Sequence, residues 1–238
     1  MTHSIAPTSA VPQLSWVAPL FRTAAQLDEL VARISQVSAR LGLAYEIILV
    51  DDACPEGSGE IAQRLAQQHA HLRVLRLPAN GGQDPAVRAG LRLARGDWAV
   101  ILDADLQDPP EALERLWAQR DAMDAVFTRR TGHYTTFGRR MTSRLYRRAI
   151  ELVGDLPRGA CLYVLLERAL VDRINAAQGR RTTLLALIAS HRPRSTSVSI
   201  VRAPRAVGTS AYSPLARSRR AARSLWEMFA ACHLRRAL

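Results

Sequence analysis

The sequence predicts an α/β protein in which helices cover both faces of a mostly parallel central sheet. The first observation is that short apolar segments alternate with longer amphipathic ones, as they do in parallel sheets built from strand–helix units. The second is that the apolar segments are nearly continuous, which is typical of strands buried on both faces. The third is that two of them end in paired acids, Asp51 and Asp52 in one case, Asp103 and Asp105 in the other. Proteins of this class bind ligands where the strands end.

The first half of the chain is expected to alternate between strands and helices. Residues 1–13 are rich in Ser, Thr, Ala and Pro and are expected to be a flexible N-terminus. Ser58 is expected to cap the second helix. Apolar runs predict strands at 14–20, 45–50, 72–77 and 98–102, and helical periodicity predicts helices at 24–41, 60–69 and 85–95.

The second half has a less regular pattern. Strands are predicted at 125–128, 162–166 and 195–201, and helices at 136–153, 167–177, 184–188 and 213–238. We expect one domain at 14–212, followed by a basic amphipathic helix at 213–238. The Trp and Phe of that last helix favour a membrane interface, but a helix docked on the domain, or a contact in a homo-oligomer, would have the same pattern.

Length and composition restrict the class of protein. A chain of 238 residues that is 48% hydrophobic suits one large domain with a sizeable core. The 3 cysteines are too few and too scattered for a disulfide framework or a zinc site, so a reducing, cytoplasmic location is expected. We find neither a signal-peptide pattern nor an apolar run of the ~20 residues that span a bilayer.

The charge is distributed unevenly along the chain. All 33 basic residues are arginine. Residues 1–126 carry 11 arginines and 16 acids, whereas residues 127–238 carry 22 arginines and 5 acids. This division predicts an acidic catalytic half and a basic half that faces anions, such as phosphate groups or an anionic membrane surface. No basic motif with interleaved aromatic residues is present, so nucleic acid is not an expected partner.

The paired acids after the strand at 98–102 suggest a metal site. Asp103, Asp105 and the amide oxygen of Gln107 are hard oxygen donors, which suit Mg²⁺ or Mn²⁺ and a substrate diphosphate held by the metal. An alternative is a turn in which the aspartates make local hydrogen bonds before a helix N-cap. For a lone Asp-x-Asp the turn would be the better interpretation, but the whole string favours the metal.

Residues 103–111, Asp-Ala-Asp-Leu-Gln-Asp-Pro-Pro-Glu, resemble the core motif of the family 2 glycosyltransferases. The resemblance is greatest to the polyprenyl-phosphate sugar transferases, the dolichol-phosphate mannose synthase group and its bacterial relatives. Residues 46–52, the Asn-Gly-Gly-Gln of 80–83 with the Ala-Gly-Leu of 89–91, and residues 205–213 resemble further segments of that family in the same order. The resemblance covers roughly residues 14–223 and implies a GT-A nucleotide-binding domain.

The resemblance also implies roles for individual residues. It implies metal ligands at Asp103, Asp105 and Gln107 for Mg²⁺ or Mn²⁺, and catalytic roles for Asp105 and Arg205. Asp155 is a further candidate catalytic residue, as a base. It implies contacts with the nucleotide sugar at Pro19, Phe21, Asp51, Asp52, Gly82, Gln83, Asp103, Arg129 and Ser210.

Five positions depart from the family pattern. Arg22 and Thr23 replace the family's Asn and acid, Leu162 and Val164 replace an Asp and an Arg, and Ala211 replaces the Lys of the closing loop. The lost acceptor-side Asp is tolerable if the acceptor is a phosphate, which is already ionised near neutral pH and needs no general base. Asp155 or Asp108 is a candidate base for a hydroxyl acceptor.

The sequence therefore predicts an inverting, metal-dependent glycosyltransferase. It would move a hexose from a UDP- or GDP-sugar to a polyprenyl phosphate, and it would be cytoplasmic and peripheral at the inner face of the membrane. One alternative is a soluble transferase that acts on a glycan or a small molecule. Another is an inactive relative that binds an anionic partner through its arginines.

Overall fold

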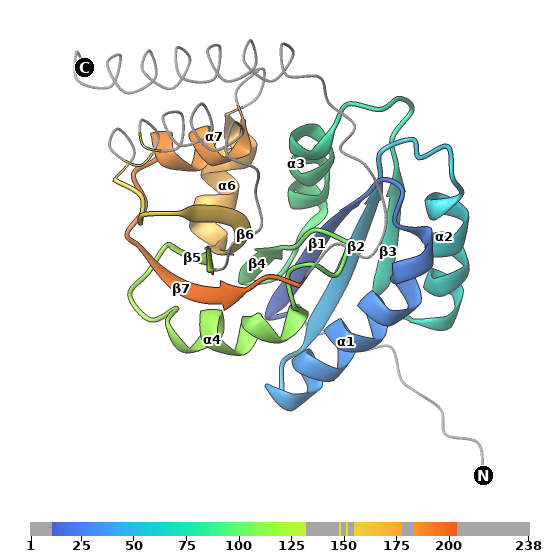
Figure 1. Cartoon of the computed structure of the whole chain (residues 1–238), viewed down its shortest axis with the longest axis horizontal. Helices are drawn as coiled ribbons and strands as arrows, with labels where there is room; N and C mark the ends of the chain where they lie inside the picture. Colours follow the sequence, from blue (N-terminus) through green and yellow to red (C-terminus); the bar gives the residue numbers. More distant parts are fainter. Residues whose placement is uncertain (1–10, 132–147, 149–150, 152–154, 178–182, 204–238) are drawn as a thin grey trace.

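The computed structural model describes residues 11–131, 148, 151, 155–177 and 183–203 (Figure 1). The predicted helix at 213–238 lies outside these residues, and the predicted helix at 136–153 lies almost wholly outside them.

The described strands form one sheet of 7 strands in the order β3-β2-β1-β4-β6-β5-β7. Every strand predicted from the sequence is present, and the bounds of β1 and β7 agree with the prediction. The strands are β1 Leu14–Leu20, β2 Tyr45–Asp51, β3 Leu72–Arg76, β4 Trp98–Ile101, β5 Ala125–Thr131, β6 Ala160–Glu167 and β7 Ser195–Val201.

The α-helices are α1 Leu27–Arg40, α2 Ser58–Gln68, α3 Gln83–Leu93, α4 Leu113–Ala118, α6 Arg168–Ala176 and α7 Leu184–Ser190. The 3-10 turns η1 Ala24–Gln26 and η2 Pro110–Ala112 precede α1 and α4. One expectation was wrong, because Gly57 is the N-cap of α2 and Ser58 is its first residue. The Ser58 hydroxyl instead accepts a hydrogen bond from the Thr23 backbone N–H at 3.3 Å.

Strand direction determines which residues meet at the site. β1 is parallel to β2 and β4, β2 is parallel to β3, and β5 is parallel to β7. β6 is antiparallel to both β4 and β5, so β4, β5 and β7 all point the same way. The carboxyl ends of β1, β2, β4, β5 and β7 therefore lie along one edge of the sheet.

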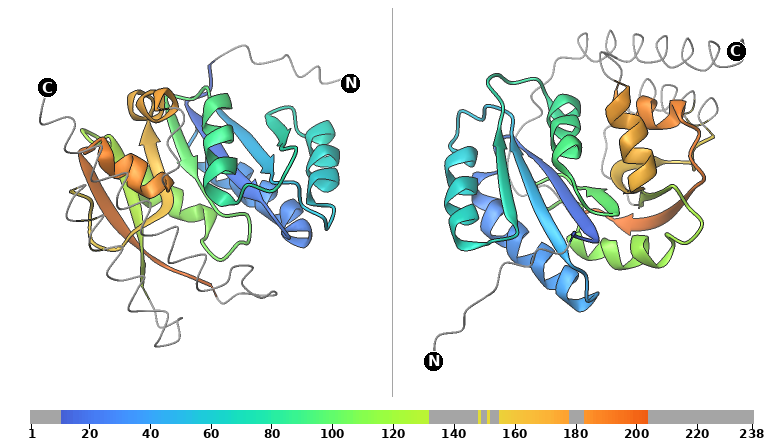
Figure 2. Two further views of the ribbon diagram at one scale, coloured as in Figure 1. Left: turned by 90° about the horizontal axis from the view of Figure 1, so that it is seen from above. Right: turned by 180° about the vertical axis from the view of Figure 1, so that it is seen from behind.

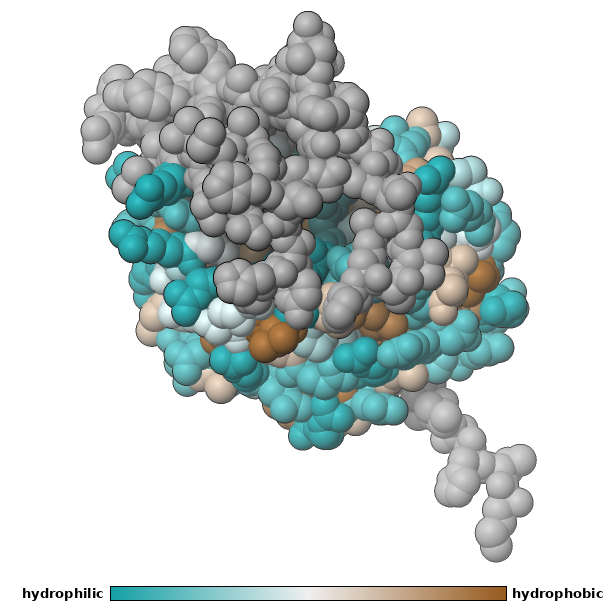
Figure 3. All heavy atoms as spheres, in the orientation of Figure 1, coloured by the Kyte–Doolittle hydropathy of each residue, from teal (hydrophilic) through white to brown (hydrophobic). Residues whose placement is uncertain are grey.

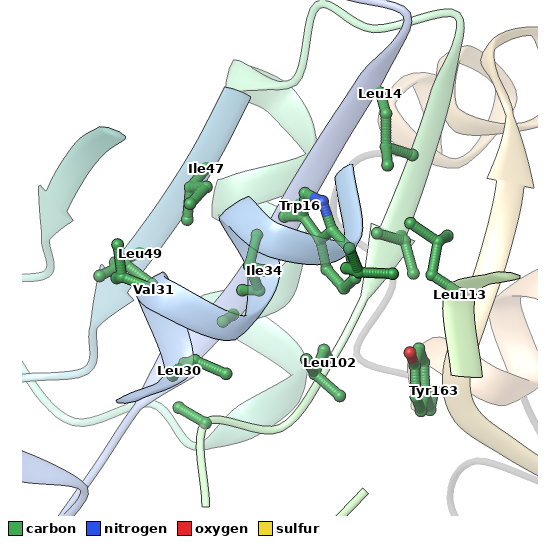
Figure 4. Close-up of a cluster of buried hydrophobic side chains, with 14 of the residues drawn as sticks. Leu14, Trp16, Leu30, Val31, Ile34, Ile47, Leu49, Leu102, Leu113 and Tyr163 are labelled. Atoms are coloured by element: carbon green, nitrogen blue, oxygen red, sulfur yellow. The ribbon is translucent and has the colours of Figure 1, made fainter. Parts of the chain in front are cut away.

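Two apolar cores lie on opposite faces of the sheet. Figure 2 shows the helices that cover these two faces. Alternate side chains of one strand face opposite sides, so Trp16 of β1 joins one core and Val17 joins the other. The first core packs the sheet against α1, α2 and α4, and Figure 4 shows Trp16 beside Ile34 of α1. Trp16 also donates its indole N–H to the Ser38 hydroxyl of α1 at 3.0 Å. The second core packs the sheet against α3, α6 and α7, which confirms helices on both faces.

The described surface is largely polar where it can be seen in Figure 3, with apolar residues in small separate spots over its lower part. Among the helices that the structure describes, none has both the length and the hydropathy needed to cross a bilayer.

Candidate active site

Residues 103–108, which we call the acid loop, follow directly from β4. The strand ends at Ile101, and the N–H of Leu102 still bonds to the carbonyl of Val17 in β1 at 3.1 Å. Leu106 has a positive φ of 55°, and the Asp105 carboxylate accepts the Gln107 N–H at 3.2 Å. The loop therefore folds back on itself directly beyond the carboxyl end of a central strand.

Tyr163 of β6 fixes the far end of the acid loop. Its buried hydroxyl contacts the backbone carbonyls of Pro109 and Pro110 at 3.1 and 3.0 Å, where η2 begins. Burial raises the pKa of this phenol well above its usual value, and the nearby Asp108 and Glu111 carboxylates reinforce the shift. The Tyr163 hydroxyl therefore stays protonated and can donate to these carbonyls.

The three carboxylates of the acid loop differ in exposure. The side chains of Asp103 and Asp105 are 29% and 22% exposed, whereas that of Asp108 is 0% exposed. Burial raises the pKa of Asp103 to about 6; Arg130 opposes the shift, and the like charges of Asp105 and Asp108 add to it. Two partly exposed carboxylates at a strand end, one of them reluctant to ionise, favour a cation between them.

Arg130, near the end of β5, donates hydrogen bonds to both carboxylate oxygens of the buried Asp108. Its Nε donates to Asp108 Oδ1 at 3.1 Å and its Nη2 donates to Asp108 Oδ2. The same Nη2 lies 3.7 Å from Asp103 Oδ2. Burial lowers the pKa of Arg130, but the hydrogen bonds and charge of Asp108 outweigh it and raise the pKa.

Arg202, one residue beyond β7, is the second cation at the acid loop. The backbone N–H of Ala203 donates to the Gln107 carbonyl at 2.8 Å, so the end of β7 is tied to the loop. The Arg202 guanidinium lies 3.8 Å from Asp105 and 3.6 Å from Asp108.

The second acid pair, at the end of β2, is held by protein donors. Asp51 Oδ1 accepts the Cys54 N–H at 3.0 Å, and Asp51 Oδ2 accepts from Arg76 Nε at 3.2 Å. The two oxygens of Asp52 accept the N–H groups of Gly81 and Gly82 at 2.8 and 2.7 Å.

A chain of hydrogen bonds joins the two acid pairs. Asp52 holds Gly82, the N-cap of α3, and the next side chain, Gln83, donates its amide to Asp103 Oδ1. Gly82 has a φ of 86°, which side chains other than glycine rarely adopt. The structure thus brings four residues predicted from the sequence into one network: Asp52, Gly82, Gln83 and Asp103.

Pro19 and Phe21 lie at the carboxyl end of β1, beside β2, and both are partly exposed. The guanidinium of Arg22 lies 5.4 Å from the centre of the Phe21 ring and pairs with Glu56 at 3.0 Å. The Arg22 N–H donates to the sulfur of Cys54 at 3.1 Å. Arg22 therefore occupies the place of the family's Asn at this edge.

The remaining residues predicted from the sequence differ in their exposure and in their contacts. Arg129 of β5 is exposed and donates to the Ser199 hydroxyl at 2.8 Å. Asp155 is exposed with a φ of 54°, and no contact found among the described residues joins it to the acid loop. Val164 is fully buried opposite Ile101, and Leu162 is partly buried against the second core. Arg205, Ser210 and Ala211 lie outside the described residues.

The donor set of the acid loop fits a divalent metal that also binds a substrate phosphate. Among the described residues, no cluster of 3 or more His, Cys, Asp or Glu side chains can hold a metal alone. Mg²⁺ and Mn²⁺ sites in phosphate-transfer enzymes commonly use one or two carboxylates and take their other ligands from phosphate and water. Asp103 and Asp105 provide such a pair, and Gln107 sits in the same loop.

Arg130 and Arg202 are the site residues that sequence reasoning missed. Both are single arginines in the half of the chain that holds 22 of them, so composition does not distinguish them. A usable signal was present, because each stands within two residues of the end of a predicted strand.

The chain is similar to known proteins over most of its length. The family model described as glycosyl transferase family 2 matches residues 15–180. The undecaprenyl-phosphate 4-deoxy-4-formamido-L-arabinose transferase of Enterobacter sp. (strain 638) is 32% identical over 208 residues, which cover 86% of this chain and 64% of that protein. The protein of the same name from Salmonella paratyphi B is 30% identical and covers 85% of this chain. The chain spans less than two thirds of the length of these relatives.

Two solved structures show the same fold. A mannosyltransferase from Pyrobaculum calidifontis, solved with GDP-Man and Mn²⁺, has a TM-score of 0.61 at 19% identity, covering 93% of this chain and 64% of its own. Glucosyl-3-phosphoglycerate synthase from Mycobacterium tuberculosis, solved with Mn²⁺, UDP and glucosyl-3-phosphoglycerate, has a TM-score of 0.64 at 17% identity, covering 93% and 80%. The α/β architecture is therefore the GT-A fold.

Proposed function

Because the chain belongs to glycosyl transferase family 2, we propose that it transfers a sugar from a nucleoside diphosphate sugar to polyprenyl phosphate with the help of a divalent metal. The observation that carries the proposal is the pair Asp103 and Asp105, partly exposed at the carboxyl edge of the sheet and faced by Arg130 and Arg202. Such an arrangement suits a metal-bound diphosphate, which is the leaving group of this reaction.

The residues of the site divide the work. Asp103 and Asp105 would hold Mg²⁺ or Mn²⁺, with the Gln107 amide as the third proposed ligand, and the metal would neutralise charge on the departing diphosphate. Gln83 orients Asp103, and Asp52 orients Gln83 through Gly82. Pro19, Phe21 and Asp51 lie at the carboxyl ends of β1 and β2, where a nucleoside would lie. Arg129, with Arg205 and Ser210 from the segment after β7, would contact the phosphates.

The reaction needs an attacking oxygen that is already nucleophilic. In the inverting mechanism that we propose, the acceptor oxygen attacks the anomeric carbon, the bond to the diphosphate breaks, and the nucleoside diphosphate leaves with the electron pair. A phosphate acceptor is ionised near neutral pH, so it needs no general base. Asp108, one of the two candidate bases, is fully buried and bound by Arg130, which does not suit a base that must reach an acceptor.

The nature of the acceptor rests on the relatives as well. The two relatives named above are undecaprenyl-phosphate transferases, and they match most of this chain. We place the reaction at the cytosolic face of the membrane, where a polyprenyl phosphate would meet a soluble nucleotide sugar. The arginine-rich second half, with 22 arginines against 5 acids, suits an anionic membrane surface.

A transfer assay tests the proposal. The purified chain is incubated with undecaprenyl phosphate in detergent, a panel of UDP-, GDP- and dTDP-sugars, and Mg²⁺ or Mn²⁺, and lipid-linked sugar is detected by mass spectrometry. We expect one donor to give a lipid-phosphate-linked sugar only when metal is present. Chelation should abolish the product.

Asp105→Asn and Asp121→Asn form a matched pair for this assay. Both remove one carboxylate charge. The side chain of Asp121, however, is 87% exposed, and its ion-pair partner is the neighbouring Arg120 and not a residue of the acid loop. We expect Asp105→Asn to lose activity and Asp121→Asn to keep it. Absence of turnover with every donor would overturn the proposal.

A further inference from the structure

The guanidinium of Arg202 faces two carboxylates without bonding to either. Its Nη2 lies 3.8 Å from Asp105 Oδ2, and its Nε lies 3.6 Å from Asp108 Oδ1. Both distances exceed those of N–H···O hydrogen bonds. The Nε is buried, and it finds no acceptor in the part of the chain that the structure describes.

A buried donor without an acceptor is unfavourable and uncommon, so it calls for a physical explanation. Arg130 shows what a satisfied arginine looks like in this site, since it binds both oxygens of Asp108. Because Arg130 already occupies Asp108, Arg202 is left at ion-pair distance from that carboxylate, and its Nε has no acceptor among the described residues. Poor anchoring is not the reason, because the adjacent Ala203 N–H is fixed to the Gln107 carbonyl at 2.8 Å.

The charge balance indicates what kind of acceptor is missing. The acid loop carries three carboxylates, and two arginines of the described part of the chain face them. A divalent cation on Asp103 and Asp105 would give the cluster a net positive charge and would draw Asp105 away from Arg202. An anion with several oxygens would then complete the site, and the planar fork of arginine matches phosphate oxygens.

We infer that Arg202 binds the diphosphate of the sugar donor, and of the departing nucleoside diphosphate, beside the metal held by Asp103 and Asp105. This inference rests on the proposed function and adds a substrate-binding residue to it. The backbone beside Arg202 is held against the acid loop through the Ala203 N–H before the substrate arrives, so the guanidinium already lies close to where the leaving charge develops.

The test is calorimetric titration of the full-length chain with UDP, GDP, UMP and GMP in the presence of Mn²⁺. Arg202→Gln removes the charge and the fork, and Arg202→Lys keeps only the charge. Arg194→Gln is the matched control, because it removes the same charge at another place. Arg194 pairs with Asp124 at the surface, away from the acid loop. Unfolding curves of each variant report whether the fold is intact.

We expect wild type and Arg194→Gln to bind one nucleoside diphosphate equally well. Arg202→Gln should weaken that binding at least tenfold and Arg202→Lys several-fold, while the binding of Mn²⁺ alone, followed by its electron paramagnetic resonance, stays the same or becomes tighter. Should Arg202→Gln fail to fold, Arg202→Lys provides the same comparison.

Diphosphate affinity that is unchanged in both Arg202 variants, with wild type binding normally, would overturn the inference and leave the proposed function standing. Weakened Mn²⁺ binding with an unchanged affinity for the diphosphate would also overturn it, because Arg202 would then serve the acid loop alone. Failure of the wild-type chain to bind any of the four nucleotides would overturn both.

Discussion

Arg130 and Asp108 form an ion pair that joins the end of β5 to the acid loop, with Arg130 Nε donating to Asp108 Oδ1 at 3.1 Å. The carboxylate is fully buried, while the Arg130 side chain is 32% exposed. The pair stands beside the proposed metal ligands without including them, so it holds the loop in position.

Removing Arg130 should destabilise the fold more than removing its neighbour does. Arg130→Gln leaves the buried charge of Asp108 without its main partner, which costs about 3 kcal/mol, the lower end for a broken buried pair because Arg130 is partly exposed. Arg129→Gln removes an exposed arginine that makes one hydrogen bond to the described residues, and it should cost well under about 1 kcal/mol. Urea unfolding measures both, and equal losses would show that Asp108 does not depend on Arg130.

Metal binding should weaken in mild acid. The pKa of Asp103 is about 6 without metal, and a metal ligand must be deprotonated, so protons compete with the metal below that pH. We expect Mn²⁺ affinity to be nearly constant above pH 7 and to fall about tenfold per pH unit below about 6, since one proton is displaced. Titrations at pH 5, 6 and 7.5 check this, and a flat profile across that range would contradict the role given to Asp103.

Tyr163→Phe should loosen the far end of the acid loop. The change leaves the ring in the core but removes a buried hydroxyl from the carbonyls of Pro109 and Pro110. The expected loss of stability is about 1 kcal/mol, with a weaker affinity for Mn²⁺ because the loop is less well positioned. Unfolding and metal titration of the same sample measure both quantities; a loss of stability with unchanged metal affinity would separate Tyr163 from the site.

Glu46 should make stability depend on pH at the other end of the sheet. Burial raises its pKa, but hydrogen bonds from Ser15 and Arg95 outweigh this, so the pKa is lowered overall. Its folded pKa lies below its unfolded pKa of about 4.3, so the stabilisation is present above pH ~4.3 and is lost as the pH falls through the folded pKa.

Glu46→Gln tests this assignment. The difference in melting temperature between wild type and the variant should be largest near pH 7 and should shrink towards pH 3.5. Glu114→Gln is a control, because the Glu114 side chain is exposed and pairs with Arg40 at the surface. A difference that is the same at both pH values would mean that the charge of Glu46 contributes nothing.

The strands were predictable because a strand buried in a sheet is made of apolar residues, and this pattern can be seen in the sequence. β1 and β7 have bounds that apolar patterning alone predicted, and the acids after β2 and β4 marked the edge where the site lies. The antiparallel direction of β6 was not predictable in the same way. It depends on pairing with β4 and β5, and a buried strand shows the same apolar run in either direction.

The roles of side chains at the site were only partly predictable. Asp108 was expected as a candidate base because it is a carboxylate near the motif, but pairing with Arg130, 22 residues away, buries it. Ser58 fits a helix cap by type, yet its hydroxyl lies against Thr23 and Cys54. Such outcomes are decided by contacts between distant segments, and local propensity carries no information about them.

The measurement that tests the central proposal most directly is a thermal-shift screen of UDP-, GDP- and dTDP-sugars, with and without Mn²⁺. A ligand that binds only the folded state raises the melting temperature in step with the logarithm of its concentration. The proposed function predicts a shift with one nucleotide class, dependent on Mn²⁺ and lost in Asp105→Asn. No shift with any donor, or a shift that persists without metal and in Asp105→Asn, would contradict it.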